Sequence, residues 1–197
     1  MPPFYNFRDA QLKKKVGFYL LAGLLIVVIA EVVLRVFFSG QLQLPDDERS
    51  LMYRHDAELG WFPEANSSHT FLGSQKINVV HNNLGFRDHH HGRKTKKRIA
   101  FIGDSFTWGY DVEQPERFTE KLQKLVPNWE VLNLGVSGYG TAQDLLLLQK
   151  YFDHYQPDIV FLVFDTESDH LDNKLNKIYG DYFKPYFVNE LDRLVLK

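Results

Sequence analysis

The chain has 197 residues, a length that fits one domain of ordinary size with a short appendage and excludes a large multidomain protein. Hydrophobic residues make up 44% of it and charged residues 24%, which is the composition of a globular protein rather than a disordered one. The net charge of -2 gives no support to bulk nucleic-acid binding. The absence of cysteine excludes a disulfide scaffold, a thiolate zinc site and a cysteine nucleophile.

A net positive segment, residues 1–15, precedes an apolar run over residues 16–38. Only Glu31 and Arg35 interrupt the run, and their spacing of four places them on one helix face, where they can pair. A helix of this length extends roughly 35 Å, enough to cross a bilayer core of about 30 Å. We predict a cytoplasmic tail, then a transmembrane anchor, with the rest of the chain outside the cytoplasm because basic flanks stay inside. A cleaved signal peptide and a buried soluble helix remain open as alternatives.

The next part of the chain predicts a linker and then short extended pieces. Residues 39–56 are polar with a proline and are predicted to be a linker. Residues 57–97 form a lead-in region, in which two short runs around Gly73 and Ser74 predict a hairpin. A turn is expected at residues 82–85. The basic residues 92–98 are expected to form a surface loop.

From residue 98 to residue 197 the pattern predicts an α/β core. Short apolar runs typical of buried strands cover residues 99–102, 131–134 and 159–164. Helical spacing of apolar residues covers residues 115–126 and 141–155. This alternation predicts a parallel sheet with helices on both faces.

Three polar segments follow the three predicted strands, at the sheet edge where α/β proteins bind ligands. They are residues 103–107, residues 133–140 and residues 165–169. Ser105 follows a buried strand at the start of a loop that leads to a helix, which is a suitable position for a nucleophile. The glycines of the second segment would let backbone N–H groups approach a developing oxyanion.

These segments resemble the SGNH/GDSL hydrolases in their order along the chain. IAFIGDSFTWGYDV resembles block I of that family, NLGVSGYGT resembles block II, and PDIVFLVFDTESDHLDN resembles the segment around block III. ELGWFP and NNLGFRD resemble the lead-in of membrane-anchored bacterial members. The resemblance implies a three-layer, flavodoxin-like fold. It also implies an enzyme that hydrolyses an acyl ester of a surface glycan or lipid, or transfers its acyl group. It implies no metal or organic cofactor.

The resemblance assigns the site residues one by one. It implies that Ser105 is the nucleophile and that the N–H groups of Ser105 and Gly138 bind the oxyanion. Asp104 and Asp169 are supporting residues, with Asp104 expected to stabilise a turn. The block III position usually holds asparagine and here holds Ser168, a weaker donor. Losing one oxyanion donor costs about 100- to 1000-fold in rate.

The general base of the family, an Asp-x-x-His motif in block V, has no counterpart after Ser105. The only such spacing joins Asp88 to His91, upstream in a polar loop. Among the later histidines, His154 is expected on a surface and His170 is a candidate substitute base. We expect a chain that stops before block V, ending in a strand (LVLK). The alternative is a catalytically inactive binding module of the same fold.

Two further features have a structural and a functional interpretation. The consecutive histidines His89, His90 and His91 are expected to form a solvated turn rather than a metal site. Trp108 is expected to pack in the core, but its position just after the predicted nucleophile also makes it a candidate for substrate contact.

Overall fold

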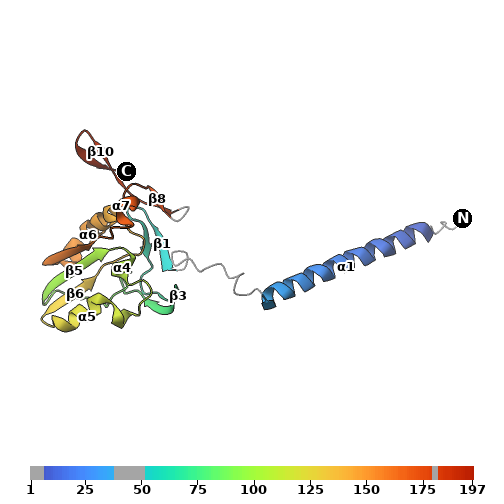
Figure 1. Ribbon diagram of the computed structural model, residues 1–197, viewed down its shortest axis with the longest axis horizontal. Coiled ribbons are helices and arrows are strands. Elements are labelled where there is room, and N and C mark those ends of the chain that lie inside the picture. The colour runs from blue at the N-terminus through green and yellow to red at the C-terminus, as the bar shows by residue number, and fades with distance from the viewer. Residues whose placement is uncertain (1–6, 38–51, 179–181) are drawn as a thin grey trace. The chain divides into compact units, whose positions relative to one another are not determined.

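The computed structural model describes residues 7–37, 52–178 and 182–197. The chain divides into two compact units, Met1–Pro45 and Asp46–Lys197, which are described separately. The first unit holds the long helix α1 (Phe7–Phe37), drawn in blue in Figure 1. Its segment Gln11–Phe37 is long and apolar enough to cross a membrane, and an 18-residue window within it has a mean hydropathy of 2.6 with no residue buried. By its length and composition, such a helix near the N-terminus could be a single membrane span or a signal sequence.

Helix α1 begins earlier than the sequence predicts. It starts at Phe7 and not at Val16, because the lysines of the basic segment are good helix formers and continue the helical turns. The expected pair is confirmed, since Arg35 Nε donates to Glu31 Oε1 at 2.7 Å. Most of the predicted linker, residues 39–51, lies outside the described residues.

The lead-in region contains two antiparallel hairpins. Strand β1 (Tyr53–Asp56) pairs with β2 (Gly60–Pro63), so the predicted linker is wrong at its last four residues. Strand β3 (Ser68–Leu72) pairs with β4 (Lys76–Val80), which confirms the predicted hairpin. The predicted turn is also present, because the Asn82 side chain accepts the Leu84 and Phe86 N–H groups.

A small parallel sheet forms the centre of the second unit and has the order β6-β5-β7. Its strands are β5 (Lys97–Gly103), β6 (Trp129–Asn133) and β7 (Ile159–Val163). Between them lie α4 (Ser105–Trp108), the 3-10 turn η1 (Gln114–Glu116), α5 (Phe118–Leu125) and α6 (Thr141–Tyr155). The prediction of a mixed α/β fold with a parallel sheet is therefore confirmed.

The two longer helices cover opposite faces of this sheet, because alternate residues of β5 enter different clusters. Ala100 and Ile102 pack with Leu147 and Tyr155 of α6. On the other face, Ile99, Phe101 and Val131 pack with Leu122 of α5 and with Val126, which directly follows that helix. Figure 1 shows α5 and α6 on the two sides of the strands.

After β7 the chain forms the short helix α7 (Asp169–Asp172) and two small antiparallel pairs. Strand β8 (Lys177–Ile178) pairs with β9 (Tyr182–Phe183), and β10 (Phe187–Glu190) pairs with β11 (Arg193–Leu196). The expected C-terminal strand exists, but it closes a hairpin and does not join the central sheet. The predicted α/β core therefore gives way to hairpins near its end.

Two further expectations need correction. Arg98 is not on the surface; it is 1% exposed and donates to Glu130 Oε2 and to the Tyr155 carbonyl. The helix expected over residues 115–126 is interrupted at Arg117, which has extended dihedrals. Its guanidinium group is buried, donates to Glu120 Oε1 at 2.7 Å and hydrogen-bonds the Arg87 carbonyl. These buried hydrogen bonds compensate for the break in the helix.

Candidate active site at the carboxyl end of the sheet

The first polar segment connects β5 to α4 through a tight turn. Asp104 is the N-cap of α4, and its Oδ1 accepts the Phe106 N–H at 2.9 Å. Ser105 is the first residue of that helix and lines a cavity of about 470 Å³. Gly103 has a φ of +152°, and a Cβ there would lie 2.7 Å from the Val163 carbonyl oxygen. Glycine therefore allows β5 and β7 to approach each other just below the predicted nucleophile.

The second polar segment packs directly against the first. Val136 N–H donates to the Gly103 carbonyl at 2.9 Å, and the Asn133 side chain donates to the Thr107 carbonyl at 2.7 Å. Gly135 lies so close to α4 that a Cβ on it would be 2.5 Å from the backbone nitrogen of Trp108. Gly138 has a φ of +80°, a conformation that favours glycine. The segments predicted to carry the nucleophile and an oxyanion donor are therefore in contact.

The side chains of the third polar segment form hydrogen bonds within that segment. Asp165 N–H donates to Asp169 Oδ2 at 2.8 Å, and the Ser168 hydroxyl donates to Asp165 Oδ2 at 2.6 Å. This hydrogen bond from Ser168 lowers the pKa of Asp165. The single hydroxyl proton of Ser168 is therefore engaged with a carboxylate. To donate to an oxyanion, Ser168 would have to leave this partner.

Three buried carboxyl groups lie close enough to perturb one another at this end of the sheet. Burial raises the pKa of Asp104 to about 6, and the Asp169 and Asp165 carboxylates act in the same direction, against the Phe106 N–H. Burial, followed by the charges of Asp169 and Asp104, raises the pKa of Asp144 well above its usual range. Burial also raises the pKa of Asp169. At each of these three positions, burial of the carboxyl group opposes its ionisation.

Asp144 and Lys184 are polar groups of this region to which sequence reasoning gave no functional role. Asp144 is 1% exposed, and neither of its carboxyl oxygens has a hydrogen-bond partner among the described residues. Lys184 is 6% exposed, and its Nζ lies 3.8 Å from Asp172 Oδ1. A polar position in the first turn of a predicted helix was the only sequence signal at Asp144, and such positions are usually solvated.

The Asp88 side chain is buried and the His91 side chain is 11% exposed, whereas His89 and His90 are exposed, as expected for a solvated turn. His91 Nε2 and Asp88 Oδ2 are 2.9 Å apart, and the same oxygen accepts the Asn133 N–H. Arg117 lies 3.8 Å from Asp88 Oδ1. The pair thus ties the lead-in region to the end of β6. Neither Asp88 nor His91 is hydrogen-bonded to Ser105 in the described part of the chain.

The other histidines have separate environments. His89 faces Glu120 and His90 faces Asn83, while His154 and His170 are exposed. In the described residues, no group of three His, Cys, Asp or Glu side chains could hold a metal ion. No histidine of the described chain is hydrogen-bonded to the Ser105 hydroxyl.

Trp108 is a core residue. It is completely buried in the cluster of Met52, Phe71, Ile77 and Val79, and the Arg87 guanidinium lies 4.7 Å from its ring centroid. The packing role expected for this tryptophan is therefore confirmed.

No protein-family model matches the chain, and no curated protein matches it.

Proposed function

We propose that this chain is an SGNH/GDSL-type serine hydrolase that acts on an acyl ester outside the cytoplasm, held at the membrane by α1. The observation that carries the proposal is the position of Ser105 at the start of α4, directly after the central strand, with the glycine-rich second segment packed on that helix. The strand order β6-β5-β7 also agrees with the first three strands of a flavodoxin-like sheet.

In the proposed reaction, Ser105 Oγ attacks the ester carbonyl and forms a tetrahedral oxyanion. The backbone N–H groups of Ser105 and Gly138 donate to it. The oxyanion then collapses, the alcohol leaves with the proton that the Ser105 hydroxyl has lost, and the acyl group stays on Ser105 until water or another acceptor takes it. The cavity beside Ser105, with walls that include Tyr110, Val112 and Phe118, offers room for the substrate. The substrate class proposed is an acyl ester of a surface glycan or lipid.

A second candidate function is a binding module that keeps the fold and lacks the chemistry. The hydrogen bond from Ser168 to Asp165 supports it, because it engages the weak third oxyanion donor. The lack of a histidine partner for Ser105 in the described chain supports it as well. Without a base, Ser105 would keep its proton and remain a poor nucleophile.

The two candidates are separated by a nucleophile assay on the full chain in lipid nanodiscs. The hydrolase proposal expects a fluorophosphonate probe to label the protein and p-nitrophenyl acetate to be hydrolysed. Ser105→Ala should abolish both, whereas Ser68→Ala, an exposed strand position, should change neither. Labelling that persists in Ser105→Ala, or no labelling of the unchanged chain, would overturn the hydrolase proposal and leave the binding module.

A further inference from the structure

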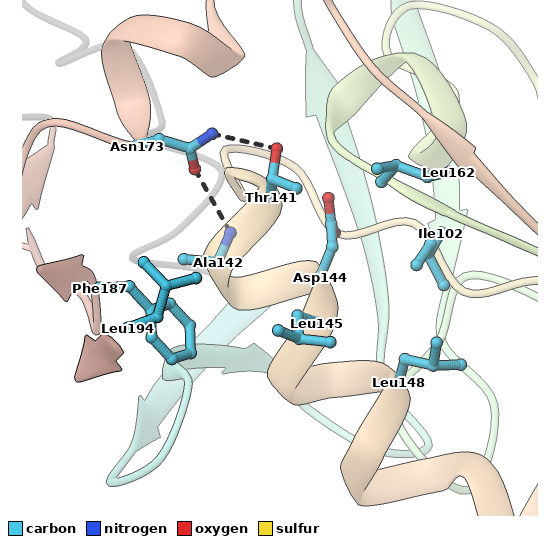
Figure 2. A pocket seen from close by; sticks show the side chains of 10 residues that line it. All are labelled: Ile102, Thr141, Ala142, Asp144, Leu145, Leu148, Leu162, Asn173, Phe187 and Leu194. Atoms are coloured by element: carbon cyan, nitrogen blue, oxygen red, sulfur yellow. Dashed lines mark hydrogen bonds between the residues drawn. The ribbon is translucent and has the colours of Figure 1, made fainter. Parts of the chain in front are cut away.

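A second cavity lies away from Ser105, on the face of the sheet that α6 covers. It has a volume of about 450 Å³. Its apolar walls come from three places: the sheet, helix α6 and the C-terminal hairpin. The residues that form these walls, shown in Figure 2, are Ile102, Leu162, Leu145, Leu148, Phe187 and Leu194. A pocket with such walls and only a few polar groups is the usual form of a small-molecule site.

The polar groups of this cavity lie around the first turn of α6. Two of them bind each other, because Asn173 donates to Thr141 Oγ1 at 3.1 Å and accepts the Ala142 N–H at 3.3 Å (Figure 2). Asp144 differs, since both of its carboxyl oxygens lack a donor in the described part of the chain. A buried polar group without a partner is rare and calls for an explanation, such as a missing ligand.

The surroundings of Asp144 indicate which ligand would complete it. The carboxyl groups of Asp104 and Asp169 both act electrostatically on Asp144. The nearby ammonium group of Lys184 is 3.8 Å from Asp172 and has no hydrogen-bond contact with Asp144. Both Asp144 carboxyl oxygens therefore lack a donor, and a head group that brings positive charge and N–H donors complements them. The chain itself already places an aliphatic ammonium group beside a carboxylate in this region, in the pair Asp172 and Lys184.

We propose that this cavity binds a primary alkylammonium ligand, with the alkyl chain between α6 and the C-terminal hairpin and the ammonium group at Asp144. The apolar walls recognise the chain, and the carboxyl group recognises the head. The proposal does not depend on Ser105 or on ester hydrolysis. The raised pKa of Asp144 is that of the group without its ligand; a bound ammonium favours the ionised carboxylate.

The proposal is tested by isothermal titration of the full chain in nanodiscs with hexylamine, 1-hexanol and hexanoate, subtracting the signal of empty nanodiscs. The three probes share one chain and differ in the head group. Hexylamine, an ammonium ion at pH 7, should bind about 10-fold or more tightly than hexanol, because it adds a charge-assisted hydrogen bond. Hexanoate should bind weakest. Propylamine, three methylenes shorter, should lose about 4-fold in affinity per methylene.

Two variants with matched controls locate the site. Asp144→Asn should abolish the preference for the amine, whereas Asp153→Asn, at an exposed position of the same helix, should keep it. Leu145→Trp should fill the cavity and weaken hexylamine binding at least 10-fold, whereas Leu125→Trp, an exposed position on α5, should not. If Asp144→Asn fails to fold, the effect of Leu145→Trp on hexylamine binding still tests the proposal. Equal affinities for amine and alcohol, no binding of any probe, or unchanged binding by Leu145→Trp would each overturn the proposal.

Discussion

Replacement of Gly135 by alanine tests whether the second polar segment packs on α4 as described. The new Cβ would lie 2.5 Å from the backbone nitrogen of Trp108, 2.6 Å from Thr107 Cβ and 2.7 Å from the Thr107 carbonyl carbon. Two of these are backbone atoms, which cannot rotate away as the end of a flexible side chain can. Overpacking of this kind costs about 1–3 kcal/mol of unfolding free energy. For a domain of this size, each kcal/mol lowers the Tm by about 2–4 °C.

The assay is thermal unfolding of the full chain in nanodiscs, followed by tryptophan fluorescence. The three tryptophans all lie outside α1, so the signal reports the second unit alone. Gly135→Ala should lower the Tm by about 2–12 °C. Gly92→Ala is the matched control, because nothing lies within 4 Å of its added Cβ. If the two variants unfold at the same temperature, the described contact between the second segment and α4 is wrong.

Three further predictions concern buried charge and the membrane. Asp104→Asn should gain stability relative to the unchanged chain as the pH rises from about 4 to about 6, and the gain should level off above that. The reason is that the Asp104 carboxyl group has a pKa of about 6 in the folded state, so folding opposes its ionisation, and the asparagine variant does not have this cost. Urea unfolding of both proteins at several pH values measures the difference in stability. A difference that does not change with pH would contradict the prediction. Arg117→Ala should destabilise the second unit by about 3–5 kcal/mol, because it removes a buried guanidinium from the buried Asp88 carboxylate and the partly buried Glu120 carboxylate. The exposed Arg93→Ala should change urea unfolding by less than about 0.5 kcal/mol, and equal effects of the two would show that Arg117 is not buried. The full chain should stay in the membrane pellet after an alkaline carbonate wash with its N-terminus intact, whereas a protein that has lost its N-terminal residues through cleavage within or after α1 would identify a cleaved signal.

Much of the fold was predictable because its signals are local. The apolar length of α1, the hairpin of β3 and β4, the turn at Asn82 and the helix Thr141–Tyr155 each depend on residues close together in the chain. The parallel sheet followed from the alternation of apolar runs and helical patterns. The failures occurred where a distant partner overrides a local signal. Arg98, the last residue of the basic run, is buried because Glu130 and the Tyr155 carbonyl accept hydrogen bonds from its guanidinium group.

The candidate site was predictable as a set of segments but not as a set of contacts. Ser105 follows its strand as expected, and the position of Gly138 in the second segment agrees with a tight backbone turn. The partner of Ser168 was not predictable, because the sequence does not fix the direction of the Asp165 side chain, two residues after the end of β7. Asp144 was missed because its burial depends on the packing of α6 against β5.

The sequence by itself determined the apolar N-terminal helix, the α/β alternation and the order of the three polar segments along the chain, since periodicity and turn residues encode these over short distances. Only the tertiary structure decided which charges are buried, which glycines contact a neighbouring backbone and where an unpartnered carboxyl group meets an apolar cavity. Those properties depend on segments that are far apart in the chain and meet only after folding, so no local pattern specifies them.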